Sequence, residues 1–410
     1  MTLALAAATF LAILVRPFRV AEAWWACAGA LLLVVTGLVP GDAAARAALR
    51  GGDVYLFLLG MMLLAEILRS QGIFERLASH ALRAAGTSQT RLFALVFGVG
   101  VGVTVFFSND ATAVVLTPAV AGMLARTKVS PYPYVFACAF VANAASFVLP
   151  ISNPANLVVF GDHLPQLGPW LGAFLVPSLL AIALTFLVLL VAHRVRLSAR
   201  LEADAAALSA PSRGERAAAI ACAVAASGLV VANSVSAPLG ISTLGLALAA
   251  FAALACVDRS VLRTVPSGIN YGIVPLVAGL FVIVEALDRA GGLAFARAGL
   301  GHAQAFHAPF ATLAAGGAIA LACNVINNLP VALGVASVFA ADPLASPALH
   351  HSALIAVDLG PNVAVSGSLA TLLWMDALRR EHLAMDALRF LRHGVAITVP
   401  ALLAALLAVR

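Results

Sequence analysis

The chain has 410 residues, of which 62% are hydrophobic and only 10% are charged. Soluble domains carry about 25% charged residues, so this composition excludes a soluble domain and indicates a polytopic membrane protein. The net charge of +6 then reports orientation in the bilayer rather than binding to nucleic acid. The apolar runs are too long for barrel strands, so we predict an all-α fold.

The predicted helices follow the same order in each half of the chain. The N-terminal repeat, residues 1–193, has helices near 2–16, 22–39 and 53–69, a re-entrant hairpin at 91–126, a broken helix at 132–161 and a span at 169–193. A hydrophilic cytoplasmic linker, 194–216, follows it. The C-terminal repeat, residues 217–410, has helices near 216–236, 240–257 and 268–289, a hairpin at 308–341, a broken helix at 350–378 and a span at 393–409.

Matching segments support this internal repeat. A Gly, a Glu and a second Gly in residues 60–72 recur in residues 279–291, at an offset of 219. The polar segment 106–112 corresponds to 324–330 at nearly the same offset, and residues 152–157 match 367–372 at an offset of 215. Each repeat has about five crossings, and an odd number inverts the second repeat relative to the first.

The distribution of basic residues predicts the orientation. A cytoplasmic linker leaves few of the 24 basic residues on the outer side, namely Arg46, Arg50, Arg289, Arg297 and Arg410. This asymmetry agrees with the positive-inside rule. We therefore predict a multi-pass protein of the inner cell membrane with both termini outside the cytoplasm and with hairpin tips that meet near the midplane.

Polar side chains interrupt the apolar sequence at each hairpin tip. They are Asn109, Asp110 and Thr112 in the first hairpin and Asn327 and Asn328 in the second. Asn and Asp commonly cap helices, which is the alternative explanation. Polar groups at membrane depth are costly, however, and usually face a pathway or a cavity. Their occurrence in both halves predicts a substrate-binding role.

The predicted helix breaks add a second set of neutral polar groups. Pro150 and Pro154 interrupt the first broken helix, and Pro361 interrupts the second. A plain kink is the alternative, but unwound backbone at membrane depth suits a binding site. The candidate substrate-binding residues here are Ser152, Asn153, Asn156, Gly367, Ser368 and Thr371.

Two acidic residues are candidates for ion coupling. Asp110 lies in the first hairpin tip, and Asp358 precedes the second break by two residues. Burial favours the neutral form of a carboxyl group, so protonation near neutral pH becomes accessible. We predict that Asp110 first, and Asp358 second, carry protons or bind Na⁺.

Two other intramembrane acids have a simpler explanation. Glu66 and Glu285 lie near helix ends, and Arg69 and Arg289 follow them within about one helical turn. We expect ion pairs on one helix face rather than a functional site.

Several other chemistries lack the residues that they need. Lys128 is the only lysine and no Gly-Lys pair occurs, so the chain has no Walker loop and does not hydrolyse ATP itself. The five cysteines have no Cys-x-x-Cys spacing, and no hydrolase motif occurs. We therefore predict no metal, no cofactor and no enzymatic activity, and an intramembrane enzyme and a channel are the less favoured alternatives. A separate cytoplasmic ATPase partner and a homodimer are left open.

The motifs taken together resemble those of the arsenite efflux permeases, the arsenical-pump membrane protein family of the ion-transporter superfamily. The match covers nearly the whole chain, at residues 64–68, 72–74, 108–111, 116–118, 152–156 and 327–330. The most specific element is Asp-Leu-Gly-Pro at 358–361 followed by Gly-Ser-Leu-Ala-Thr-Leu-Leu-Trp at 367–374. Without it, the motifs would equally fit Na⁺/H⁺ antiporters or carriers of dicarboxylates or silicic acid.

The resemblance implies a secondary transporter for arsenical resistance that exports arsenite, and antimonite, in exchange for protons by alternating access. Arsenous acid is an uncharged trihydroxyl compound at neutral pH, and a site of Asn, Thr, Ser and backbone groups suits it. This chain departs from the family pattern, which commonly has Lys at the position of Asn362 and Thr-Pro-Ile at 364–366. The departure leaves the proton stoichiometry open.

Overall fold

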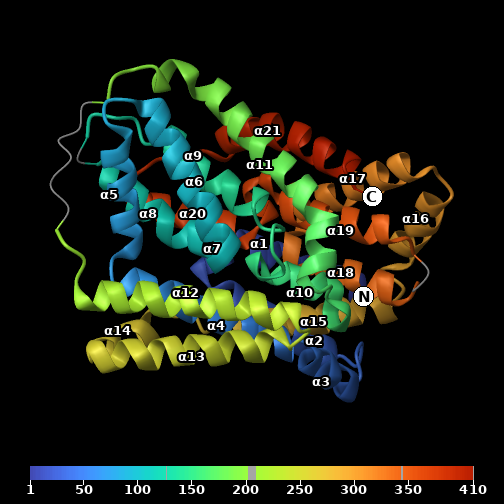
Figure 1. Cartoon of the computed structure of the whole chain (residues 1–410). Helices are drawn as coiled ribbons and strands as arrows, with labels where there is room; N and C mark the ends of the chain where they lie inside the picture. The colour runs from blue at the N-terminus through green and yellow to red at the C-terminus, as the bar shows by residue number, and fades with distance from the viewer. Residues whose placement is uncertain (126, 202–208, 343–344, 410) are drawn as a thin grey trace.

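The protein is a bundle of helices (Figure 1). The computed structural model describes residues 1–125, 127–201, 209–342 and 345–409. Within these ranges the extended backbone pairs only at an isolated bridge between Ser88 and Arg200. The prediction of an all-α fold is therefore confirmed.

The described residues contain seven helices that are long and apolar enough to cross a membrane. The bent pair Gly41–Arg50 and Gly52–Ser70, at 43°, would make an eighth. The prediction of a polytopic membrane protein is confirmed. Four further apolar helices in the described ranges are shorter, so five crossings per repeat and the inversion of the second repeat stay predictions.

The described part of the N-terminal half consists of α-helices joined by short 3₁₀ or π segments. In chain order they are α1 (Thr2–Val15), η1 (Pro17–Arg19), α2 (Glu22–Val35), α3 (Gly41–Arg50), α4 (Gly52–Ser70), α5 (Ile73–Ala85), α6 (Gln89–Phe107), α7 (Asn109–Ala111), the π-helix η2 (Thr112–Leu116), α8 (Thr117–Leu124), α9 (Tyr132–Ala144), η3 (Pro150–Ser152), α10 (Pro154–Phe160), η4 (Gly161–His163) and α11 (Leu167–Leu197).

The described part of the C-terminal half has a similar series of helices. Its elements are α12 (Arg213–Ser234), α13 (Leu239–Val257), α14 (Val261–Gly268), α15 (Ile273–Arg289), α16 (Ala294–Gln304), α17 (Ala308–Ile326), α18 (Asn328–Ala340), α19 (Pro347–Leu359), η5 (Gly360–Asn362), η6 (Val365–Gly367), α20 (Leu369–Arg380) and α21 (Ala387–Leu407).

Several short helices were not predicted, namely α3, α5, α14 and α16. They are too short and too polar to be recognised as spans. In α5, Phe74, Ala78, Ala81 and Ala85 are buried while most of the remaining side chains are at least partly exposed. This spacing is that of one helix face, so α5 is an amphipathic helix that packs beside the spans.

The backbone conformation recurs in the two halves at a nearly constant spacing. Ser108 and Asn327, at the same offset as the repeated glycines, have positive φ angles of 94° and 79° between the two limbs of each hairpin. Asn153 and Ser368, at the offset of the matching break segments, are both extended and both cap the helix after a break. Each half therefore has a chain reversal followed by a helix interruption at a nearly constant spacing, while the bounds of the hairpins and broken helices as repeated units stay predictions.

Helices of each half pack against helices of the other half. Helix α4 packs against α13 of the other half, and α15 packs against α2. The repeated glycines lie at these crossings: Gly60 approaches the backbone of Thr243 and Leu244, and Gly279 approaches the backbone of Ala26. The recurrence of this glycine therefore has a steric cause, because each position leaves no room for a side chain.

The broken helices also pack against elements of the other half. Helix α20 of the C-terminal half packs against α7, η2 and α8 of the first hairpin, and α10 of the N-terminal half packs against α18 of the second hairpin. The return limb of each hairpin therefore rests on a helix from the other half, and the two breaks lie in the interior between them.

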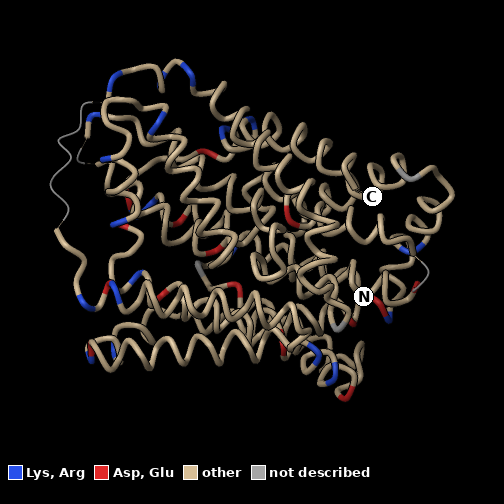
Figure 2. The backbone as a smooth tube through the Cα atoms, viewed as in Figure 1, with Lys and Arg blue, Asp and Glu red and all other residues tan. Residues whose placement is uncertain are grey.

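Charge is unevenly distributed between the two ends of the bundle. The end of α11 and the start of α12 lie at the left of Figure 1, whereas the start of α1 and the end of α21 lie at the right. Figure 2 shows that most Lys and Arg residues gather at the left end. This arrangement agrees with a linker and termini on opposite sides, but the side that faces the cytoplasm stays a prediction.

The described ends of the predicted linker are held to the bundle. Helix α12 begins at Arg213 with a capping box, in which Glu215 N donates to Ser212 Oγ at 3.0 Å and Ser212 N donates to Glu215 Oε2 at 2.7 Å. Leu201 N donates to Thr87 O at 2.9 Å. Residues 202–208 of the predicted linker lie outside the described residues. Residue 126, the predicted end of the first hairpin, also lies outside them.

Replacing Gly60 or Gly279 by Ala should destabilise the protein by about 1–3 kcal/mol, because a Cβ would come within about 2.8 Å of backbone atoms of the facing helix. Gly98→Ala in α6 is the matched control, since nothing lies within 4 Å of its Cβ position. Thermal unfolding in detergent measures the difference. Equal melting temperatures for all three variants would contradict the proposed helix crossings.

Candidate functional site

The first hairpin reverses direction at Ser108. Its positive φ lets the chain leave α6 and enter α7, and its Oγ accepts a hydrogen bond from Ala111 N at 3.4 Å. Asn109 is buried, and its Oδ1 accepts from Asp110 N at 2.9 Å. The polar side chains of this tip therefore supply partners for backbone N–H groups that begin the return limb.

A π-helical turn follows the tip. Thr112 begins it, and its hydroxyl lies 2.8 Å from that of Thr104 on the other limb. Thr117 Oγ1 donates to Thr112 O at 3.2 Å. Because π-helical turns frequently occur at functional sites, this segment is a candidate for one. The Thr112 hydroxyl itself already bonds across the hairpin.

Asp110 differs from its neighbours in this tip. It is partly buried, and its carboxylate forms no hydrogen bond or ion pair with any described residue. A partly buried carboxyl group without a partner among the described residues can accept a proton or contact a cation or a hydroxyl group.

The second hairpin has the same backbone but different side-chain contacts. Asn327 Oδ1 accepts from Leu329 N at 3.3 Å, and Asn327 Nδ2 donates to Ser366 O at 3.3 Å. Asn328 is buried, and among the described residues its side chain has no hydrogen-bond partner. The pair therefore divides into Asn327, which holds the turn, and Asn328, whose amide is available.

Asn324 was not among the predicted site residues, yet it ties the second hairpin to the second break. Its Nδ2 donates to Gly360 O and to Ala320 O, both at 2.8 Å, and its Oδ1 accepts from Ala364 N at 2.7 Å. One side chain thus satisfies backbone groups that the break leaves without helical partners.

A buried carboxyl group joins the two breaks. Asp358 of α19 is fully buried and accepts hydrogen bonds from Ser146 Oγ at 2.8 Å and from Asn153 Nδ2 at 2.9 Å. Both donors belong to the first broken helix. The structure therefore brings together Asn153 and Asp358, two residues that the sequence assigned to a site, and adds Ser146.

A second set of hydrogen bonds runs beside the first. Asn143 Nδ2 donates to Asn362 Oδ1 at 2.9 Å, and Asn362 Nδ2 donates to Phe140 O at 3.0 Å. Asn109 Nδ2 approaches Asn143 Oδ1 at 3.5 Å. The first hairpin tip is thereby connected through Asn143 to the second break. No sequence signal pointed to Asn143, because its partner lies in the other half of the chain.

Three of the predicted residues at the breaks bond to backbone or lack space. Ser152 Oγ donates to Val105 O at 2.9 Å, and Asn156 Nδ2 donates to three backbone carbonyls. A Cβ on Gly367 would lie 2.3 Å from Pro361 O. These contacts hold the shape of the breaks, whereas Asn156 Oδ1 is buried and has no hydrogen-bond partner among the described residues.

The other two predicted residues at the second break begin α20. Ser368 is buried and caps this helix, since its Oγ accepts from Ala370 N at 3.2 Å. Thr371 is buried one turn later, on the helix that packs against the first hairpin. Thr371 and Asp110 therefore belong to elements that pack together, whereas Asn328 belongs to the other hairpin.

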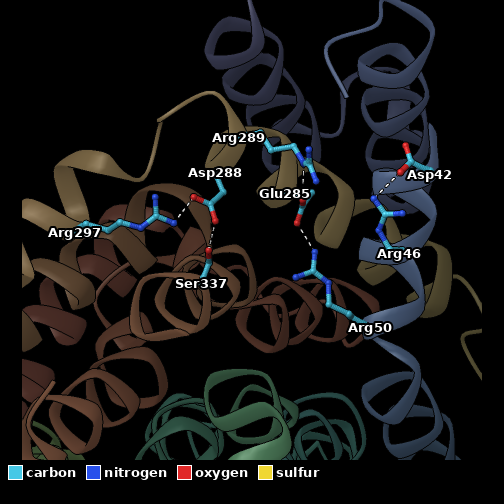
Figure 3. A network of polar contacts seen from close by, with 8 residues as sticks. All are labelled: Asp42, Arg46, Arg50, Glu285, Asp288, Arg289, Arg297 and Ser337. Carbon is cyan, nitrogen blue, oxygen red and sulfur yellow. Dashed lines mark hydrogen bonds and ion pairs between the residues drawn. The ribbon is translucent and has the colours of Figure 1, made fainter. Parts of the chain in front are cut away.

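The expected ion pairs are confirmed. Arg69 Nε donates to Glu66 Oε2 at 2.6 Å, and Arg289 Nε donates to Glu285 Oε1 at 2.6 Å. Figure 3 shows that Arg50 also reaches Glu285, which the sequence did not predict. A cavity of about 590 Å³ adjoins Glu285. Both pairs lie near the ends of their helices, so these acids are held by arginine rather than left available to a substrate.

Comparisons with known proteins find membrane transporters. The family model described as "Citrate transporter" matches residues 10–357. The chain is 29% identical to the arsenical pump membrane protein of Escherichia coli K12, over 98% of this chain and 96% of that protein. It is 28% identical to the arsenical pump membrane protein of Yersinia enterocolitica, over 85% and 84%. The solved structure of the YdaH transporter of Alcanivorax borkumensis aligns with a TM-score of 0.49 and 16% identity, over 92% of this chain and 87% of that one.

Asn324→Ala should lower the stability of the protein by about 2–3 kcal/mol, because Gly360 O and Ala364 N would lose their partners in the interior. Asn328→Ala is the control in the same hairpin, and we expect little change in its melting temperature, since that amide bonds to no described residue. Thermal unfolding of both variants in detergent tests the assignment. A variant at Asn324 as stable as the wild type would contradict it.

Proposed function

This chain belongs to the citrate transporter family, and we propose that within this family it is a secondary transporter that exports trivalent arsenite in exchange for protons. Its relatives include proteins named arsenical pump membrane protein, which match nearly its full length. We extend the proposal to antimonite, whose trihydroxyl form presents the same hydrogen-bonding groups.

The observation that carries the proposal is the chemistry of the hairpin tips and breaks. Asn109, Asn328 and Thr371 offer neutral amide or hydroxyl groups, and Asp110 offers a carboxyl group that bonds to no described residue. None of the predicted substrate-binding residues is basic. Such a set suits an uncharged compound with several hydroxyl groups, which both donates and accepts hydrogen bonds, better than it suits a multiply charged anion.

Protons supply the driving force in this proposal. Inward movement of one charge across a membrane contributes about 2.3 kcal/mol per 100 mV. We assign the first coupling role to Asp110, because its carboxyl group has no competing partner in the described protein. Asp358 is the second candidate, and its bonds to Ser146 and Asn153 would have to rearrange when its protonation changes.

The packing of each half against the other supports transport by alternating access. Each hairpin rests on the broken helix of the other half, so a shift of one hairpin with its partner helix would open the site to one side at a time. In this scheme the first hairpin opens toward the cytoplasm and the second toward the outside, and the protein lies in the inner membrane with both termini outside.

The family description favours a second candidate, transport of citrate, a tricarboxylate, or of a dicarboxylate. A carboxylate substrate in the membrane interior needs cationic partners. The predicted substrate-binding residues supply none, so this function would require bound Na⁺ at Asp110. Na⁺/H⁺ exchange and silicic acid transport are the remaining alternatives.

Expression in an arsenite-sensitive bacterial strain should lower cellular arsenic and raise the tolerated arsenite concentration. Vesicles with an imposed proton gradient then separate the candidates, since arsenite and antimonite should move when the gradient is present and citrate should not. Correct membrane insertion without any change in arsenic accumulation would refute arsenite export.

Asp110→Asn should abolish proton-driven efflux and leave the folded protein intact, because the amide cannot exchange a proton but fills the same space. Asp42→Asn is the matched control, since Asp42 is exposed and pairs with Arg46 on α3, outside the proposed site. Efflux in vesicles and melting temperature are measured for both. Normal proton-driven efflux by the Asp110 variant would remove this residue from coupling.

A further inference from the structure

A cationic cavity lies away from the hairpin tips, where α11 and α21 pack together. Its volume is about 420 Å³, and it is lined by Ala192, His193, Val195, Arg196, Arg389 and His393. The residues of the last turns of α11 are Ala192, His193, Val195 and Arg196. The first turns of α21 contribute Arg389 and His393. The cavity therefore joins the last helices of the two halves.

The lining carries positive charge that no described residue neutralises through an ion pair. The charge comes from its two arginines; the lining also includes two histidines and contains no acidic residue. Neither Arg196 nor Arg389 forms an ion pair with a described residue. Arg389 lies over the ring of Tyr132 at 4.1 Å, a contact that orients the guanidinium group without neutralising it.

A buried nitrogen in the same cavity lacks a partner. His193 is 2% exposed, and its Nε2 has no hydrogen-bond partner among the described residues. Its ring stacks on those of Phe136 and His393, at centroid distances of 5.9 and 5.4 Å. Because buried polar nitrogens in native proteins are nearly always hydrogen-bonded, an imidazole held firmly in place with a free Nε2 indicates that a ligand completes the site.

The chemistry of these groups selects an anion. Two guanidinium groups present several N–H donors in a planar arrangement that matches the oxygens of a phosphate. An imidazole N–H can add a third donor. A cavity of this size has room for a phosphate group, and basic cavities between membrane helices commonly receive the head groups of anionic lipids.

We propose that this cavity is a binding site for a phosphate group, either inorganic phosphate or the head group of an anionic phospholipid. Arg196 and Arg389 contact the phosphate oxygens from the two helices, and His193 donates from the floor of the cavity. A bound phosphate thereby links the last helix of the N-terminal half to that of the C-terminal half. This inference is independent of the transported substrate.

The test uses the purified full-length chain in a neutral detergent, with inorganic phosphate titrated at constant ionic strength. In a second arm, the chain is reconstituted in phosphatidylcholine vesicles with and without phosphatidylglycerol. Binding should raise the melting temperature in at least one arm. A shift with inorganic phosphate identifies a soluble ligand, and a shift with phosphatidylglycerol alone identifies a lipid head group.

Arg196→Gln and Arg389→Gln should each weaken binding about ten-fold, as expected for the loss of one charge-assisted hydrogen bond. Arg194→Gln is the matched control, because Arg194 is in the same turn of α11 but does not line the cavity. His193→Phe keeps the ring stack and removes the donor, so it should also weaken binding without unfolding the protein.

Two results would overturn the proposal. One is the absence of a melting-temperature shift with either phosphate source in the wild-type protein. The other is an equal loss of binding in Arg194→Gln and Arg196→Gln, which would mean that only the general positive charge of this end attracts the anion. Monodisperse elution of each variant on size exclusion confirms that the comparison is made between folded proteins.

Discussion

The structure depends on one buried carboxyl group that neither half can accommodate alone. Asp358 belongs to the second broken helix, and its hydrogen-bond donors, Ser146 and Asn153, belong to the first. An ionised carboxyl group that is fully buried without hydrogen bonds costs several kcal/mol, so these two bonds favour the arrangement in which the breaks lie against each other. Asn143 and Asn362 form a parallel bond between the same elements. The contact is polar and buried, and the protein itself supplies the hydrogen-bond partners that lipid cannot provide.

The rest of the bundle follows from this juxtaposition. With the breaks facing each other, each hairpin meets the broken helix of the other half. Helix α4 crosses α13 at Gly60, and α15 crosses α2 at Gly279. The breaks are thus joined by hydrogen bonds between buried polar groups, and the helix crossings are formed by close backbone packing. The two kinds of contact have different consequences. Close backbone packing favours a rigid contact, whereas hydrogen bonds to a titratable group change when that group gains or loses a proton. This difference is what makes the central contact suitable for the ion coupling that we propose.

Much of the fold follows directly from the sequence. Long apolar runs predicted the spans, and Pro150, Pro154 and Pro361 located the breaks because proline removes a helical hydrogen bond. The pairs Glu66–Arg69 and Glu285–Arg289 were predicted because residues about one helical turn apart must be neighbours. The short helices α3, α5, α14 and α16 were missed, since they are too short and too polar to be recognised as membrane spans. Asn324 and Asn143 were missed because a buried amide acquires its role from distant backbone and side-chain partners.

The sequence by itself determined that this is a helical membrane protein, because the length of its hydrophobic runs is a local property of the chain. Two related halves, each with a polar hairpin tip and a broken helix, are what its prolines and its repeated segments predict. Only the tertiary structure decided which polar residues hold the backbone and which remain available. Ser152 and Asn156 bond to carbonyl groups, whereas Asp110 and Asn328 bond through their side chains to no described residue. That distinction depends on where the other half of the chain lies, and hydrogen bonds between segments far apart in the chain leave no periodic trace in a sequence.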